Sequence, residues 1–449
     1  MRVSPEAPEQ LWHVTVLSNF IGGYDKYART YSKAGIPESR FPDRFFLLRP
    51  GELDVGVAKA TRLLHKLALP GDRLLALSTV VPSDALKANV ETGLGRYVES
   101  PTIHLDGVAY VDSTDHTCRL SRIPIEEAAA QSLRIRKRDL ISYSELIPRS
   151  FSILPIAKGC QASCPFCFSE ASVSCEQEQA QTDLNHVRRF ARAARVRGAT
   201  RFVITGGGEP GLVRPALLQQ MMRVGSQELG KVVLITNGHH LAKHPTAAIV
   251  KSLQDYANAG LSILAVSRHH HDDAVSARLM NLRTNVAAIA NAWRGERTNW
   301  PELKLRFTCV LQRGGVDGVN VMEDYVDWAT ALGVEEICFK ELYVSTSVES
   351  VYHRHASNAW SHAHQVPLSL VAQFAALHRF VEVDTLPWGS PVFAGTWQGR
   401  ALQIAAYTEP SLFWERTHGI ARSWNLMADG RCLASLEDRA SQIGLPDAA

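Results

Sequence analysis

Short apolar runs alternate with amphipathic stretches between residues 151 and 340. This alternation is typical of repeated βα units around a parallel sheet. We expect six strands, over residues 152–157, 201–205, 231–236, 261–266, 303–310 and 334–340. Helices are expected between them, near residues 183–196, 213–224, 247–257, 277–293 and 322–332. The pattern therefore predicts an α/β fold with six βα units.

The two flanks of this region have different patterns, and we expect three domains. Residues 1–140 predict an α+β accessory domain, with strands over 11–17 and 74–81, a helix over 51–69, and a hairpin over 102–111 that turns at Asp106-Gly107. Residues 141–345 form the predicted core. A C-terminal extension, residues 346–449, carries a helix near 368–380 and a strand–turn–strand over 424–433.

Composition narrows the class of protein. The chain has 449 residues, of which 48 are Lys or Arg and 45 are Asp or Glu, and this near balance disfavours a nucleic-acid partner. No apolar run reaches the roughly 18 residues that would span a bilayer, and the N-terminus lacks a signal-peptide pattern. Eight cysteines in a chain of this length do not suggest a disulfide framework. We expect a cytoplasmic protein without membrane contact.

Three of the cysteines are clustered directly after the first predicted strand. Their spacing is C-x3-C-x2-C, formed by Cys160, Cys164 and Cys167. A [4Fe–4S] cube normally takes four thiolates, so three leave one iron open to a small molecule. The alternative is a structural zinc site, which needs four ligands and usually two C-x2-C pairs. Only one such pair is present, and the next cysteine is Cys175. The spacing favours the iron–sulfur cluster.

This loop resembles the signature of the radical SAM superfamily, with Phe166 in the aromatic place before the third cysteine. A second motif, Gly207-Gly208-Glu209-Pro210, follows the second predicted strand and resembles the GGEP motif of that family. The resemblance implies a partial (β/α)6 TIM-like barrel and a [4Fe–4S] cluster on the three cysteines. It also implies S-adenosylmethionine (SAM) on the fourth iron, with its amino group held by the glycines and Glu209.

Four further polar residues follow predicted strands and are candidates for contact with SAM. Ser267 and Arg268 match in placement the residues that contact the ribose and carboxylate of SAM in this family; the alternative is an arginine in a solvated loop. Asn237 suits turn geometry first and SAM contact second. Gln312 could reach the adenine, although a plain loop position also explains it.

Candidates for substrate chemistry lie at the ends of later strands. Lys340 and Glu341 end the sixth, and one of the two side chains should face the barrel interior. Cys309 in the fifth strand, or Cys338 in the sixth, could return a hydrogen atom to a substrate radical; a packed, buried thiol is the alternative. The run from His269 to His271 could contact substrate. The remaining cysteines are scattered, so we expect a single cluster.

The predicted function is that of a radical SAM enzyme. Reductive cleavage of SAM would yield a 5′-deoxyadenosyl radical that abstracts hydrogen from a small-molecule or peptide substrate, with natural-product tailoring as the favoured role. The resemblance also implies an electron donor such as flavodoxin or ferredoxin. Two alternatives are an RNA-modifying radical SAM enzyme and a non-catalytic iron–sulfur or zinc protein that binds a partner.

Overall fold

The computed structural model divides the chain into two compact units, Met1–Leu140 and Ile141–Ala449. In the first unit the structure describes only the six strands. In the second it describes residues 141–445, except 346–349, 353–354, 388–389, 411, 413–414 and 417–418. No helix in these described parts is long and apolar enough to cross a membrane.

The first unit contains an antiparallel sheet in the order β2-β1-β3-β5-β6, with β4 also paired to β3. The predicted strands over 11–17 and 74–81 are present as β1 and β3. The predicted hairpin is different, because β4 and β5 each pair with β3. The predicted helix over 51–69 lies outside the described residues. The strands are β1 Gln10–Ser18, β2 Arg44–Leu48, β3 Asp72–Val80, β4 Ile103–His104, β5 Tyr110–Asp112 and β6 Cys118–Arg119.

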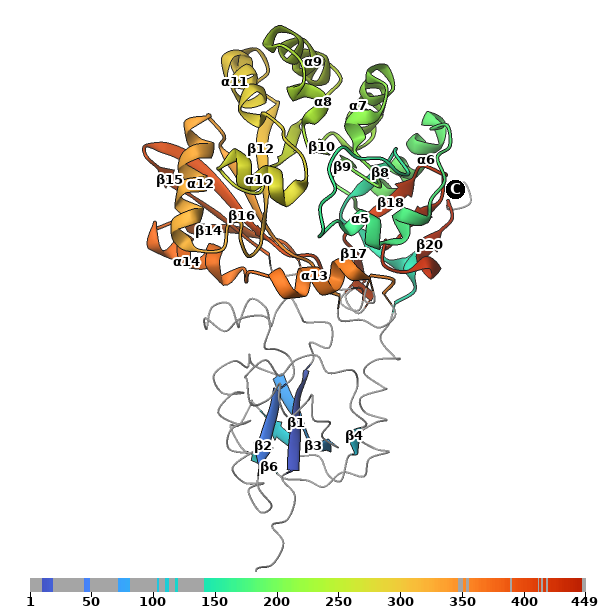
Figure 1. Ribbon diagram of the computed structural model, residues 1–449. Coiled ribbons are helices and arrows are strands. Elements are labelled where there is room, and N and C mark those ends of the chain that lie inside the picture. Colours follow the sequence, from blue (N-terminus) through green and yellow to red (C-terminus); the bar gives the residue numbers. More distant parts are fainter. Residues whose placement is uncertain are drawn as a thin grey trace, which may run out of the picture. The chain divides into compact units, whose positions relative to one another are not determined.

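The second unit is built on one twelve-stranded sheet, in the order β14-β15-β16-β13-β12-β11-β10-β9-β8-β18-β19-β20 (Figure 1). The eight strands from β16 to β18 in this order are parallel. They are β8 Phe151–Leu154, β9 Phe202–Ile204, β10 Val232–Thr236, β11 Ile263–Ser267, β12 Lys304–Leu311, β13 Glu336–Glu341, β16 Arg400–Tyr407 and β18 Trp424–Met427. The six predicted strands are thus confirmed as β8 to β13.

Residues after Ser345 extend this sheet at both of its flanks. β16 continues the parallel order beside β13, and β18 continues it beside β8. The outer strands are antiparallel, and the described strands do not close into a barrel. The outer strands are β14 Val381–Thr385, β15 Pro391–Trp397, β19 Cys432–Leu433 and β20 Gln442–Ile443. A separate parallel pair joins β7 Ile147–Pro148 to β17 Ile420–Ala421.

Helices connect the parallel strands and cover one face of the curved sheet (Figure 1). α6 shows the pattern well, because Asp183 caps its first turn and its apolar positions, including Val187 and Phe190, are buried. The connecting helices are α6 Leu184–Val196, α7 Pro215–Leu229, α8 His239–Ala242, α9 Thr246–Asn258, α10 Asp273–Met280, α11 Val286–Glu296 and α12 Val319–Ala331. The others are α5 Phe168–Ala171, α13 Ala356–His364 and α14 Ser369–Leu377.

One predicted helix is wrong. The periodicity over 277–293 suggested a continuous helix, but the structure has α10 and α11 separated by a turn. Asn281 ends α10 in the left-handed region, with φ 48°, which asparagine tolerates better than most residues. Asn285 then caps α11 through its side chain. The break places the end of α10 against the cysteine loop.

Alternation along the strands separates a helix-facing side from an inner side. On β12, Phe307 stacks on Trp328 of α12 with ring centroids 5.2 Å apart. The odd-numbered residues of β12 therefore face the helices. Even-numbered residues such as Arg306 and Thr308 face inward. Across the middle of the sheet the inner face is apolar, formed by Val203, Val233, Ile263 and Ala265.

Candidate active site at the carboxyl ends of the parallel strands

The cysteine loop follows β8 directly. Cys160 is exposed, whereas Cys164 and Cys167 are half-buried. The backbone N–H of Ala162 donates to the Cys160 sulfur at 3.4 Å, and Asn237 Nδ2 donates to it at 3.6 Å. Burial, and after it the neighbouring sulfurs, raise the pKa of Cys164 to about 12. Three thiolates this close need a compensating positive charge, which bound iron would supply.

The residues fit a cluster with open coordination better than a single ion. Among the described residues no three His, Cys, Asp or Glu side chains are grouped as ligands of one metal ion. A cube presents four irons to its ligands, so its cysteines need not converge on one point. The donors at the Cys160 sulfur are of the kind that stabilise thiolate ligands. Cys160, Cys164 and Cys167 are therefore suited to hold three irons of a [4Fe–4S] cluster.

The glycine loop after β9 packs directly on the cysteine loop. Gly208 N–H donates to the Ile156 carbonyl and Glu209 N–H to the Gly159 carbonyl, both at 2.9 Å. A Cβ on Gly208 would lie 2.1 Å from the Gly159 oxygen, and one on Gly207 would lie 2.6 Å from the Ile156 oxygen. Only glycine allows so close an approach of two backbones. The two motifs recognised in the sequence thus form one structural element.

Glu209 is buried, and its carboxylate holds the next strand end. Oε2 accepts from the Asn237 N–H at 2.9 Å, and Oε1 accepts from the Gly211 N–H at 2.8 Å and from the Thr236 hydroxyl. Burial raises the pKa of this carboxyl and the hydrogen bonds oppose the rise. A carboxylate offers about four acceptor sites, so about one remains for a ligand. Pro210 begins the short 3-10 helix Pro210–Leu212 that follows.

Asn237 links three parts of the site. Besides its contacts with Glu209 and the Cys160 sulfur, its Nδ2 lies 3.2 Å from Gln161 Oε1. Its Oδ1 accepts from the His239 N–H at 2.9 Å and so begins α8. The turn and the contact with the cysteine loop therefore come from the same side chain.

Arg268, after Ser267 at the end of β11, is directed into its own loop. Its guanidinium donates to the carbonyls of His270 and His271 and to Asp273 Oδ1, the last at 2.6 Å. The residue is 3% exposed, and its guanidinium lies 5.0 Å from the ring centroid of Trp328. This arrangement favours a role in shaping the loop over direct contact with a ligand. Ser267 itself is half-buried at the strand end.

Gln312 is fully buried, and neither side-chain amide atom has a hydrogen-bond partner among the described residues. A buried amide without partners is costly, and a ligand hydrogen bond would remove that cost. Phe166 lies nearby in the cysteine loop, with its ring 5.3 Å from that of His269 and 5.6 Å from that of Trp360 in α13. Val310 N–H, two residues before Gln312, donates to His269 Nδ1 at 3.0 Å.

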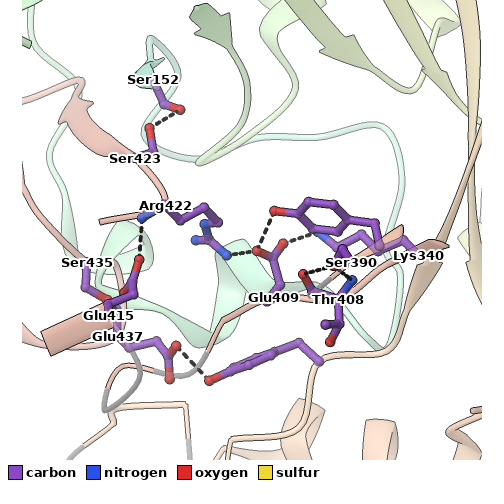
Figure 2. A network of polar contacts seen from close by, with 12 residues as sticks. Ser152, Lys340, Ser390, Thr408, Glu409, Glu415, Arg422, Ser423, Ser435 and Glu437 are labelled. Carbon is purple, nitrogen blue, oxygen red and sulfur yellow. Dashed lines mark hydrogen bonds and ion pairs between the residues drawn. The ribbon is translucent and has the colours of Figure 1, made fainter. Parts of the chain in front are cut away.

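Lys340 and Glu341 face opposite sides of the sheet. Lys340 belongs to the inner side and pairs with Glu409, which follows β16, while its amine lies 5.4 Å from the ring centroid of Tyr407. Figure 2 shows Glu409 between Lys340 and Arg422. Burial would raise the pKa of Glu409, but Arg422 and Lys340 outweigh it and lower the value to about 2. Glu341 instead accepts from Thr408 Oγ1 at 2.9 Å.

The two strand cysteines also lie on opposite sides. Cys309 is fully buried on the helix-facing side of β12, where Tyr325 of α12 is its hydrogen-bonding neighbour. Cys338 lies on the inner side of β13, half-buried, with Arg306 and Lys340 among its charged neighbours. Of the two thiols, Cys338 is placed to meet a substrate on the inner face.

Sequence reasoning missed the polar network around Glu409. Arg422 and Glu415 come from the segment between β16 and β18, which carries no motif, and a neighbouring pair joins Tyr343, after β13, to Glu437, after β19. Arg422 N–H donates to Glu415 Oε1 at 2.6 Å, and Tyr343 donates to Glu437 Oε1 at 2.7 Å. Burial raises the pKa of Glu415 to about 8. A cluster of acidic residues after residue 405 was visible, but nothing local indicated that it reaches the inner face.

Comparison with known proteins finds one family model that matches part of the chain. Residues 154–294 match the model of the Radical SAM superfamily. None of the curated proteins is similar to the chain. Solved structures with a similar arrangement include Streptococcus suis SuiB bound to its precursor peptide SuiA, with 15% identity, coverage of 78% of this chain and 72% of that chain, and a TM-score of 0.42. A radical SAM methyltransferase from Sphaerobacter thermophilus shares 14% identity over 79% and 90% of the two chains, with a TM-score of 0.35.

Proposed function

We propose that this protein, whose residues 154–294 match the Radical SAM superfamily, is a radical SAM enzyme in which Cys160, Cys164 and Cys167 hold the [4Fe–4S] cluster beside the SAM-binding loop. The observation that carries the proposal is the pair of 2.9 Å hydrogen bonds that join the cysteine loop to the Gly208-Glu209 backbone. When bound, the reduced cluster supplies the electron that cleaves SAM to methionine and a 5′-deoxyadenosyl radical, which takes a hydrogen atom from substrate.

The residues of this chain bind and orient SAM in our proposal. The backbone of Gly207, Gly208 and Pro210, together with the remaining acceptor site of Glu209, would receive the amino group. Ser267 and the buried amide of Gln312 would contact the nucleoside. Arg268 and Asn237 would act mainly by fixing the loops from which those contacts come.

Substrate would bind on the inner face of the sheet. Lys340 and Tyr407 are polar groups of this face, and they lie opposite each other at the ends of two neighbouring parallel strands. Cys338, two residues before Lys340, would be the thiol nearest to such a substrate. A small molecule or a peptide, modified in a tailoring step and served by an electron donor, remains our proposed substrate class. The balanced charge of the chain weighs against RNA.

The test is anaerobic reconstitution with iron and sulfide, followed by SAM and dithionite. We expect about four irons per chain and formation of 5′-deoxyadenosine. Replacing Cys160, Cys164 and Cys167 by alanine should abolish both, whereas replacing the other five cysteines together should retain them. Two results would refute the assignment: about eight irons per chain, or loss of the cluster in the five-cysteine variant.

A further inference from the structure

A basic pocket of about 620 Å³ lies between the segment around α8 and the turn that follows α10. His239 of α8 and Lys243, which directly follows this helix, line it on one side, and Arg283 of the turn between α10 and α11 lines it on the other. Lys243 and Arg283 are exposed, and neither has an ion-pair partner in the described part of the chain. Asp273 is the acidic residue of the lining, and its carboxylate is paired with Arg268 at 2.6 Å. The free charge of the pocket is therefore positive.

On both sides, a residue two positions before a lining residue contacts the cysteine loop: Asn237 precedes His239, and Asn281 precedes Arg283. On the α8 side, Asn237 accepts from the His239 N–H and donates to the Cys160 sulfur. On the other side, Met280 accepts from the Ser163 N–H at 3.0 Å, and Asn281 Nδ2 donates to the Ser163 carbonyl at 2.9 Å. A protein seated on Lys243 and Arg283 would lie close to the exposed Cys160.

We infer that this basic pocket is the docking surface for an acidic one-electron carrier protein. The inference rests on the proposed function, because it needs a cluster on Cys160, Cys164 and Cys167. The carrier would give one electron to the cluster held by these three cysteines, and SAM, whose sulfonium carbon–sulfur bond would break, would be the final acceptor of that electron. Transfer between proteins requires a short separation, and Asn237 and Asn281 link both sides of the pocket directly to the cysteine loop.

The positive charge of the pocket indicates which kind of partner it would bind. Redox encounters use small, transient interfaces, and complementary charge raises their association rate more than their final affinity. Unpaired lysine and arginine side chains at the rim attract a negatively charged surface, and salt screens this attraction. An acidic substrate or the carboxylate of SAM is the competing occupant, and the experiment must separate it from a carrier protein.

The experiment compares two reductants in the full-length, reconstituted enzyme. Lys243→Glu, Arg283→Glu and the double variant are assayed for 5′-deoxyadenosine with dithionite, and separately with an acidic flavodoxin reduced by its reductase. Lys251→Glu is the matched control, because this lysine on α9 is 77% exposed and lies outside the pocket. Direct binding of oxidised flavodoxin is measured at low and high salt, independently of turnover.

We expect the double variant to retain its dithionite-supported rate and to lose about tenfold or more of its flavodoxin-supported rate at low salt. Flavodoxin binding should weaken in parallel, while Lys251→Glu behaves as wild type. Unchanged binding and rate with flavodoxin would overturn the inference. An equal loss with dithionite would also overturn it, since the pocket would then serve SAM or substrate. Absence of 5′-deoxyadenosine from the wild type with dithionite would instead contradict the proposed function, and the binding measurement would still decide the docking.

Discussion

Glu409 forms an ion pair with Arg422 that connects the two flanks of the open sheet. Glu409 follows β16, on the β13 flank, and Arg422 precedes β18, on the β8 flank. Lys340 shares the same carboxylate. The described strands do not close the sheet by backbone pairing, and this network is one of the polar connections across the opening (Figure 2).

Removing one partner from this network should destabilise the fold. Glu409→Gln leaves two cations without their carboxylate, and we expect a loss of roughly 2–3 kcal/mol in the free energy of unfolding. This is less than for a fully buried pair, because Lys340 and Arg422 are 32% and 23% exposed. Urea unfolding measures it. Arg422→Met combined with Glu409→Gln should cost less than the sum of the single changes; simple additivity would contradict the coupling.

Because Glu415 is buried, we expect the folded protein to become less stable as pH rises. Its pKa is about 8 in the folded protein and 4.5 in the unfolded chain, so between these values the folded state binds the additional proton. The wild type should therefore lose up to about 1.4 kcal/mol per pH unit relative to Glu415→Gln in this window. Melting curves of the two proteins from pH 5 to pH 8 measure the difference.

Glu409 is the control, because its pKa is lowered and its effect on stability should depend on pH in the opposite direction. Its folded pKa of about 2 lies below the unfolded value of 4.5, so its contribution is present above pH 4.5 and is lost as pH falls toward 2. The advantage of wild type over Glu409→Gln should thus shrink on acidification. A difference between wild type and Glu415→Gln that is independent of pH would contradict the burial of a protonated Glu415.

Gly208→Ala should disrupt the contact between the two loops. The added methyl group would meet the Gly159 carbonyl oxygen at 2.1 Å, and the loops would have to separate. We expect weaker SAM binding and poorer retention of iron, measured by equilibrium dialysis and iron analysis. Gly295→Ala is the control, because no atom lies within 4 Å of its added Cβ and the site is in α11. That change should stabilise the protein by about 0.5–1 kcal/mol; equal effects of the two would contradict the role of Gly208.

Glu209 should act on SAM binding and on stability together. Glu209→Ala removes the acceptor of the Asn237 and Gly211 N–H groups, and each buried donor left unsatisfied costs about 1–3 kcal/mol. Glu209→Gln keeps an acceptor oxygen but lacks the negative charge. We expect the glutamine variant to fold with its cluster and to bind SAM at least tenfold more weakly by calorimetry. Wild-type affinity in the glutamine variant would argue against contact between Glu209 and SAM.

The sequence predicted those features that depend only on residues close together in the chain. The strands β8 to β13, the cysteine spacing and the glycine loop all follow from residues that are adjacent in the chain. The break at Asn281 was missed because a left-handed asparagine leaves the apolar periodicity intact on both sides. The stacking of Phe307 on Trp328 shows which side of β12 faces the helices. Because β13 pairs with β12, this also shows that Lys340 faces inward and Glu341 faces the helices.

Contacts between distant segments could not be predicted. Arg422 and Glu409 lie in a region without a motif. They meet because β16 pairs with β13 and β18 pairs with β8. The choice between Cys309 and Cys338 has the same origin. Either cysteine suits a buried strand, and the packing of α12 against β12, through Trp328 on Phe307 and Tyr325 on Cys309, shows that Cys309 faces the helices.

The pairing of β18 with β8 has a consequence for synthesis of the chain. Trp424 lies opposite Phe151, so β8, at one edge of the central sheet, has no partner strand on its outer side until β18 is made more than 270 residues later. During translation the six central strands can assemble while β8 still exposes unpaired N–H and C=O groups. The nascent protein is therefore exposed to aggregation until β18 has been made, and chaperone binding would be most useful up to that point.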